Sequence, residues 1–161
     1  MPSPPPPLAR RTPRPIKKIL CANRGEIAIR VFRAATELGL ETCAIYSHQD
    51  RVHLHRYKAD EAYHVGKGKS AVAAYLGIEE IIAIATDVAV DAIHPGYGFL
   101  AENAKLADAC DAAGIAFVGP SADVLRTFGD KTAARSLAAR VGVSTVPGTE
   151  GAVATVDEAR A

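Results

Sequence analysis

The chain has 161 residues and a formal net charge of +1, with 48% hydrophobic and 23% charged residues. This length suits one domain with a sizeable core, and the composition is typical of a globular protein. The sequence has no apolar run of about 18 residues, which excludes a membrane-spanning helix, and no basic cluster beyond its first residues, which argues against a nucleic-acid surface.

The first 15 residues differ from the rest in composition. They hold seven of the ten prolines, three arginines and no acidic residue, so the remainder carries a net charge of −2. Such a segment favours extended polyproline conformations and cannot pack a core. We therefore expect a disordered leader over residues 1–15. The alternative is an Arg-rich transit peptide, but the proline density opposes the amphipathic helix that such peptides form.

The three cysteines, Cys21, Cys43 and Cys110, stand alone within apolar runs. They lack metal-ligand spacing and do not form an even disulfide set. We predict reduced core thiols, as in a cytoplasmic protein, and no metal site.

Strand and helix patterns alternate from Ile16 onward. Residues 17–22 are predicted to form a buried strand, 26–38 a helix that Gly39 ends, and 41–46 a second strand. The apolar residues expected on the inner face of that helix are Ile27, Val31, Ala34, Ala35 and Leu38. A strand–helix–strand order predicts parallel pairing and an α/β fold.

Asp50 follows the second strand, where a dinucleotide-binding protein would place its ribose-binding acid. However, residues 22–28 contain only Gly25, so the backbone lacks the second glycine that a pyrophosphate requires. We expect Asp50 to cap a short helix over residues 52–59. His53 and His55, two residues apart, would lie on different faces of that helix and be solvated.

A further strand over residues 62–65 leads into a lysine- and glycine-rich stretch, residues 66–70. This stretch lacks the earlier glycine of a Walker phosphate loop, so a solvated turn is expected. Residues 77–85 are predicted to form a helix that leads into the next strand.

The most informative stretch runs from His94 to Asn103. It lies between a predicted buried strand (residues 87–93) and a predicted helix (104–113). Gly96 and Gly98 permit a sharp turn, and ligands bind to loops that leave the carboxyl ends of parallel strands. The turn is expected to present the Tyr97 hydroxyl to a cleft and to place Glu102 in the first helical turn. Alternatively, the glycines serve only the geometry of the turn.

The remaining elements are a strand over residues 115–118 and helices over 122–128 and 131–141. Ser121 and Asp130 are the expected caps of these two helices. Residues 142–148 read as extended. A capping box at 155–158 opens another helix within one turn of Ala161, so we expect the sequence to stop inside a domain.

Five segments taken in order resemble the amino-terminal part of biotin carboxylases, across residues 16–150. Residue Ala101 stands where the family usually has serine. Within the family, residues 55–63 and 72–76 look most like the pyruvate carboxylase branch. The five segments are Ile19–Ala28, His94–Asn103, Phe117–Ser121, Gly129–Lys131 and Thr145–Gly148.

The resemblance implies a Rossmann-like pre-ATP-grasp domain over residues 16–130, with a parallel sheet and helices on both faces. Residues 131–161 would then begin a truncated ATP-grasp region. In this family ATP and bicarbonate form carboxyphosphate, and the carbon dioxide released from it carboxylates biotin. Pyruvate carboxylase then converts pyruvate to oxaloacetate. ATP, Mg²⁺ and biotin are therefore expected with the full-length enzyme, and none of them tightly bound to the fragment.

The resemblance also implies roles for individual residues. Lys131 matches the family's ATP-binding lysine, whose ammonium holds a phosphate as a point charge; without the match it would pass for a surface lysine. Three helix residues, Arg30, Arg33 and Glu37, match the family's dimer surface, or else form a solvated helix face with an i,i+4 pair. The loop residues that match the active site are His94, Gly96, Tyr97, Gly98, Glu102 and Asn103.

The family's glycine-rich lid, its magnesium-holding acids and the residues that act on bicarbonate and biotin have no match in this chain. We therefore expect no catalytic residue in the fragment and no carboxylase activity from it alone. Three alternatives stay open: a module that dimerises with an intact biotin carboxylase and regulates it, a subunit of an acyl-CoA carboxylase, and a free-standing nucleotide-binding module.

Overall fold

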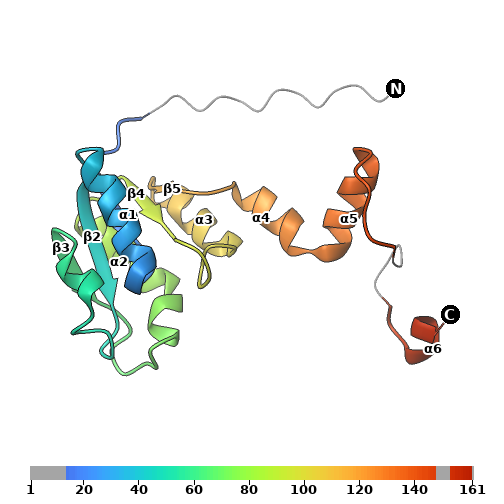
Figure 1. Cartoon of the computed structure of the whole chain (residues 1–161), viewed down its shortest axis with the longest axis horizontal. Helices are drawn as coiled ribbons and strands as arrows, with labels where there is room; N and C mark the ends of the chain where they lie inside the picture. Colours follow the sequence, from blue (N-terminus) through green and yellow to red (C-terminus); the bar gives the residue numbers. More distant parts are fainter. Residues whose placement is uncertain (1–13, 148–152, 161) are drawn as a thin grey trace.

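The computed structural model describes residues 14–147 and 153–160, so nearly all of the expected leader lies outside the described residues. The described part forms one sheet flanked by helices, with the last helices extending away from it (Figure 1). In chain order the elements are β1 (Lys18–Cys21), α1 (Gly25–Glu37), β2 (Glu41–Tyr46), η1 (Leu54–Tyr57), β3 (Glu61–His64), η2 (Ala73–Leu76), α2 (Ile78–Asp87), β4 (Ala92–His94), α3 (Ala104–Ala112), β5 (Ala116–Phe117), α4 (Ala122–Gly129), α5 (Lys131–Arg140) and α6 (Val156–Arg160).

The sheet is parallel throughout, with the strand order β3-β2-β1-β4-β5. This confirms the predicted parallel α/β fold. The chain builds outward from β1 to β2 and β3, then crosses to the other side of β1 for β4 and β5. The direction of building therefore reverses between β1 and β4. In open parallel sheets this reversal leaves a crevice at the carboxyl ends of the two strands, where ligands bind.

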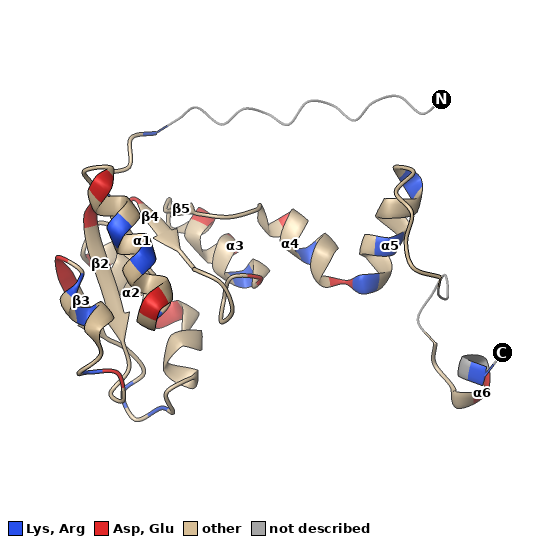
Figure 2. Cartoon of the chain, viewed as in Figure 1, with Lys and Arg blue, Asp and Glu red and all other residues tan. Residues whose placement is uncertain are grey.

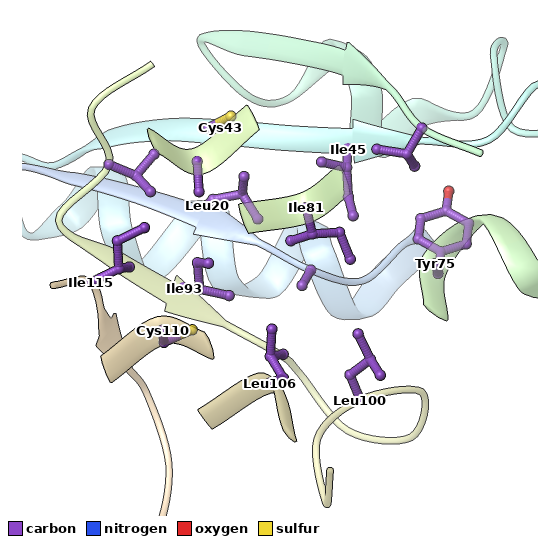
Figure 3. Close-up of a cluster of buried hydrophobic side chains, with 14 of the residues drawn as sticks. Leu20, Cys43, Ile45, Tyr75, Ile81, Ile93, Leu100, Leu106, Cys110 and Ile115 are labelled. Atoms are coloured by element: carbon purple, nitrogen blue, oxygen red, sulfur yellow. The ribbon is translucent and has the colours of Figure 1, made fainter. Parts of the chain in front are cut away.

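The alternation of side chains along β1 explains why both faces of the sheet are covered. Ile19 and Cys21 point to the α1 face, whereas Leu20 and Ala22 point to the face covered by α2 and α3. Figure 3 shows the larger core on the second face. It contains Leu20, Cys43, Ile45, Tyr75, Ile81, Ile93, Leu100, Leu106, Cys110 and Ile115.

The predicted inner face of α1 was partly wrong. Ala34 is exposed and Leu38, which follows the last helical residue, is 76% exposed. The helix instead buries Ala28, Phe32 and Ala35. The Phe32 ring packs against small residues of the sheet, so the side of α1 that carries Phe32 faces the core.

Several predicted elements are shorter in the structure. The apolar run 87–93 is not one strand, because α2 continues to Asp87 and Ala89 takes a left-handed conformation with φ 55°. Only Ala92–His94 pairs as β4, while Val90 packs into the core from the loop. The predicted helix 52–59 is a single 3-10 turn, Leu54–Tyr57. Ala113, placed in the next helix by the pattern, lies just after α3.

The three cysteines are free and buried, as predicted. Burial raises the pKa of Cys110 to about 11, so its thiol stays protonated and unreactive at neutral pH. None of the helices in the part of the chain that the structure describes is long and apolar enough to cross a membrane.

Helices α4 and α5 lead away from the sheet (Figure 1), and α5 buries none of its residues. Both predicted caps are present: the Ser121 side chain accepts from Val124 N, and Asp130 accepts from the first amides of α5. A domain boundary near residue 130 stays a prediction.

Candidate functional site

A buried asparagine joins the two loops that leave β1 and β4. Asn23 follows β1, and its Nδ2 donates to the carbonyl oxygens of Pro95 at 2.8 Å and Tyr97 at 3.0 Å. Its Oδ1 accepts from the amide of Arg24 at 2.9 Å. Because asparagine offers both donors and an acceptor, one side chain satisfies backbone groups of both loops.

Gly96 lies where the β4 loop comes closest to α1. A Cβ there would lie 2.6 Å from Ile27 Cγ2 and 2.7 Å from Asn23 Nδ2, and its φ is +67°. The Gly96 amide donates to Nδ1 of His94 at 2.9 Å, so this nitrogen acts as an acceptor. Burial lowers the pKa of His94, which favours this neutral form. The turn therefore requires glycine at position 96 for both its conformation and its packing.

Tyr97 is 63% exposed, and its hydroxyl donates to the Glu26 carboxylate in the first turn of α1. That this hydroxyl faces a ligand cleft stays a prediction. The hydrogen bond to Glu26 raises the pKa of Tyr97. This contact ties the tip of the loop to the start of α1.

Glu102 does not lie in the first helical turn, because α3 begins at Ala104. Asn103 takes the cap position, and its side chain accepts from Lys105 N at 2.9 Å. The exposed Glu102 carboxylate thus lies one residue before the cap. There it stays free to contact whatever occupies the adjoining groove.

An open groove with a volume of about 1100 Å³ connects this loop with the turn between α4 and α5. The β4 loop contributes Phe99, Glu102 and Asn103, and the turn contributes Asp130 and Lys131. Acidic and basic residues lie side by side at that turn (Figure 2). The structure therefore brings Lys131 and part of the predicted active-site loop to one surface, whereas His94, Gly96, Tyr97 and Gly98 lie outside its lining.

Arg126, which sequence reasoning missed, connects α4 with α3 at this groove. Its Nη1 lies 2.8 Å from Asp108 on α3, and its Nη2 lies 2.9 Å from Asp123 on its own helix. Nothing in the periodicity of the sequence pairs residues 108 and 126. The two residues meet only because α4 packs on α3.

Asp50 is not a helix cap but the centre of a buried polar cluster. It is 2% exposed, and its Oδ2 accepts from Tyr75 Oη at 2.8 Å and Ser47 Oγ at 2.9 Å. Arg24 Nη1 lies 3.2 Å from the same oxygen. Burial opposes ionisation of Asp50, but the hydrogen bonds from Tyr75, Ser47 and Arg24 outweigh it and lower the pKa of Asp50. The carboxylate is therefore ionised at neutral pH.

The two histidines of the predicted helix differ from each other. His53 is half exposed, with Nδ1 3.1 Å from Asp50 Oδ1, but His55 is fully buried, so the expected solvation of His55 is wrong. Its Nε2 lies 3.2 Å from the Ile45 carbonyl oxygen, and its Nδ1 has no hydrogen-bond partner. Over residues 14–147 and 153–160 no group of three or more His, Cys, Asp or Glu is placed to hold a metal ion.

The lysine- and glycine-rich stretch is a turn, as expected, with residues 67–70 exposed and Gly66 buried. The amide of Gly66 donates to both carboxylate oxygens of Glu80, each at 3.0 Å, and Lys69 Nζ lies 3.8 Å from Glu80. The Gly66 amide and the Lys69 ammonium of this turn therefore already have a carboxylate partner within the chain.

The predicted dimer residues Arg30, Arg33 and Glu37 are all exposed on α1. Arg33 Nε lies 3.6 Å from Glu37 Oε1, with both side chains more than two-thirds exposed. Such a pair contributes little to stability. A role for this surface in dimerisation stays a prediction.

The chain is similar to proteins of a known family. Residues 15–125 match the family described as biotin carboxylase, N-terminal domain. The mitochondrial pyruvate carboxylase of Homo sapiens is 57% identical over 146 residues, which is 91% of this chain and 12% of that protein. The pyruvate carboxylase of Bacillus subtilis (strain 168) is 55% identical over 142 residues, or 88% of this chain and 12% of that protein. The chain thus spans about 12% of the length of these relatives.

Solved structures show the same similarity. The complete multifunctional pyruvate carboxylase from Rhizobium etli superposes with a TM-score of 0.80 at 54% identity, covering 83% of this chain and 13% of that one. The biotin carboxylase domain dimer of Hydrogenobacter thermophilus 2-oxoglutarate carboxylase, in complex with MgADP, ADP and bicarbonate, superposes with a TM-score of 0.86 at 47% identity. That match covers 90% of this chain and 32% of that one.

Proposed function

Because the chain belongs to the biotin carboxylase N-terminal domain family, we propose that it acts as the amino-terminal part of a pyruvate carboxylase. In that enzyme it would contribute to the carboxylation of biotin with ATP and bicarbonate, and the carboxyl group would pass to pyruvate to give oxaloacetate. Relatives that are more than half identical to this chain are pyruvate carboxylases, which favours this branch over an acyl-CoA carboxylase.

The observation that carries the proposal is the convergence of Lys131 and the β4 loop on one groove. This groove adjoins the loop that leaves the carboxyl end of β4, and in open parallel sheets ligands bind at such loops. In the proposed role, the Lys131 ammonium binds a nucleotide phosphate, and Glu102 and Asn103 form the wall that faces bicarbonate and biotin. ATP, bicarbonate and biotin are therefore the ligands we propose for the complete active site.

The described residues suit phosphate better than metal. Lys131 offers a positive charge at the start of α5, but the part of the chain with described positions provides no cluster of three metal ligands. We assign the binding of Mg²⁺ to residues outside this chain, and we expect the isolated chain to hold none of the cofactors tightly.

Two further proposals follow from the same family. We propose that Arg30, Arg33 and Glu37 form part of a homo-oligomer contact; the Hydrogenobacter thermophilus relative is described as a dimer of this domain. We also propose a cytoplasmic location, which the reduced state expected for the buried thiols supports.

The proposal can be tested in a chimera of Bacillus subtilis pyruvate carboxylase, in which the matching residues of this chain replace their counterparts. We expect the purified chimera to cleave ATP in a bicarbonate-dependent manner with free biotin, and to form oxaloacetate from pyruvate. A chimera that folds and assembles but shows neither reaction would overturn the proposed function.

Lys131→Ala in the chimera tests the role of the groove. A charge-assisted hydrogen bond contributes about 1.5–3 kcal/mol, so the KM for ATP should rise roughly 10- to 100-fold. Lys67→Ala is the matched control, because Lys67 is an exposed lysine of the 66–70 turn outside the groove. An equal effect of both substitutions would contradict the role of Lys131.

A further inference from the structure

Phe99 adopts a backbone conformation that is unusual for an aromatic residue. Its φ is +42°, and it is one of two non-glycine residues with positive φ in the described ranges 14–147 and 153–160. A bulky residue in this region is strained, and such strain persists only where the surroundings hold it in place. The contacts that hold Phe99 therefore contribute to the shape of the β4 loop.

Two side chains from distant parts of the sequence make those contacts. The Phe99 ring stacks on the Tyr75 ring, with centroids 5.2 Å apart and planes 11° from parallel. The Arg24 guanidinium carbon lies 5.6 Å from the Phe99 centroid and 5.8 Å from the Tyr75 centroid. The three groups form a triangle in which stacking and cation–π attraction both favour the observed position of the Phe99 ring.

Asp50 fixes the other two members of this triangle. Tyr75 is fully buried and donates its hydroxyl to Asp50 Oδ2 at 2.8 Å, while Arg24 Nη1 lies 3.2 Å from that oxygen. The Ser47 amide also donates to the Tyr75 hydroxyl, at 3.2 Å. The Tyr75 ring therefore has little freedom to rotate away. Figure 3 shows Tyr75 at the end of the core where Leu100, the neighbour of Phe99, also lies.

The triangle borders the proposed active site without being part of its chemistry. Phe99 lines the same groove as Glu102, Asn103 and Lys131, but Arg24, Asp50 and Tyr75 do not line it. Only two residues, Leu100 and Ala101, separate Phe99 from Glu102, so a displacement of Phe99 would alter the position of Glu102. A displacement of about 1 Å in a substrate-binding group can cost on the order of 100-fold in rate.

Resting on the proposed function, we propose that Arg24, Asp50 and Tyr75 are positioning residues. They hold Phe99 in its left-handed conformation and thereby fix loop residues 96–103 in the arrangement that binds biotin and bicarbonate. Neither composition nor motif spacing pointed to this cluster, because its members come from the loop after β1, the loop after β2 and η2, and meet only in the folded chain.

Hydrogen–deuterium exchange on the 161-residue chain tests the structural half of this inference. Two loop amides report directly: Ala101 N donates to Gly98 O at 2.8 Å, and Asn103 N donates to Leu100 O at 3.0 Å. We expect Tyr75→Phe and Phe99→Leu each to accelerate exchange at these amides by about tenfold or more, whereas the β1 amides keep their protection. Protection of β1 shows that the fold is intact.

Tyr63→Phe is the matched control for Tyr75→Phe. Tyr63 also donates its hydroxyl to a carboxylate, that of Glu61 at 2.8 Å, but it lies on β3 away from the loop. The control should leave loop exchange within about twofold of the unmodified chain. Unchanged loop exchange in both Tyr75→Phe and Phe99→Leu would overturn the inference while leaving the proposed function intact.

Steady-state kinetics in the chimera test the functional half. We expect Tyr75→Phe and Phe99→Leu to raise the KM for free biotin by about tenfold, with the KM for ATP within about twofold, because the loop faces biotin and Lys131 faces the nucleotide. A merely destabilising substitution would instead lower the amount of active enzyme and leave both KM values unchanged. A loosened loop with an unchanged KM for biotin would also overturn the inference. An inactive unmodified chimera would refute the proposed function instead.

Discussion

Asn23 and Tyr97 are 74 positions apart in the sequence, yet Asn23 Nδ2 lies 3.0 Å from the Tyr97 carbonyl oxygen. The same nitrogen lies 2.8 Å from the carbonyl oxygen of Pro95. The crevice between β1 and β4 is therefore closed at its base by one amide group. Side chains further out on both loops, Glu26 and Tyr97 among them, depend on this contact for their relative positions.

Asn23→Ala should destabilise the chain more than an ordinary polar substitution. The change removes the Asn23 side-chain amide, which donates to the carbonyl oxygens of Pro95 and Tyr97. The first of these hydrogen bonds is buried and the second is partly buried, so their loss should cost about 2–4 kcal/mol. Urea unfolding followed by far-ultraviolet circular dichroism measures this loss. Asn103→Ala is the comparison, because it removes only a helix cap and should cost about 1 kcal/mol. Equal losses would show that the Asn23 bonds contribute little.

The two glycines of the loop provide a second matched pair. Gly96 and Gly98 have nearly the same φ, +67° and +70°, so alanine should cost about 1–2 kcal/mol at either position from backbone strain. A Cβ at position 98 meets nothing within 4 Å, whereas at 96 it would lie 2.6 Å from Ile27. Overpacking should therefore make Gly96→Ala worse than Gly98→Ala by about 1–3 kcal/mol.

Urea unfolding of both glycine variants distinguishes strain from packing. If the urea midpoints of Gly96→Ala and Gly98→Ala fall by the same amount, the contact between position 96 and α1 accommodates a methyl group, which would contradict the expected overpacking.

Some parts of the fold were predictable because short-range patterns specify them. Apolar runs bounded by glycine located β1, β2 and the loop after β4, and single polar residues located the caps at Ser121 and Asp130. The run 87–93 was misread because hydrophobicity alone does not distinguish the end of a helix and a buried loop from a strand.

Other parts depend on contacts that no local pattern encodes. The 3.6-residue period of α1 is compatible with several adjacent apolar faces, so the sequence pattern does not decide which one is buried. In the structure the buried face is the one on which Phe32 packs against small residues of the sheet. The position of Asp50 at a strand end was evident from the sequence, but its partner Tyr75 lies 25 residues away. Likewise, Lys131 reaches the groove through the packing of α4 on α3, where Arg126 pairs with Asp108.

The stability of the chain should fall as the pH drops below about 6.5. Burial lowers the pKa of His55 and of His94 from the ordinary value of 6.5. The unfolded chain then binds more protons than the folded chain as the pH falls through this range. The stability is fully present above the unfolded pKa and is lost as the pH falls through the lowered pKa values. Urea unfolding at a series of pH values between 5 and 7.5 would show the decline.

Substitution of His55 identifies its share of the pH dependence. His55→Gln removes the titrating ring but keeps a side-chain amide near the Ile45 carbonyl oxygen, so the decline between pH 7 and pH 5 should become shallower. His53→Gln is the control, since His53 is half exposed. A slope that stays unchanged in His55→Gln would mean that this buried imidazole does not couple to folding.

The isolated 161-residue chain should show no bicarbonate-dependent cleavage of ATP with free biotin. It places Lys131 in a groove open to solvent, on a helix that buries none of its residues, so one ammonium has to hold the nucleotide against water. The measurement is ADP release by the purified chain, with Lys131→Ala as the control. Release clearly above that of the Lys131→Ala chain would show that this segment alone assembles a working site. Calorimetry with ATP extends the test: binding should be very weak, whereas tight binding lost in Lys131→Ala would favour a free-standing nucleotide-binding module.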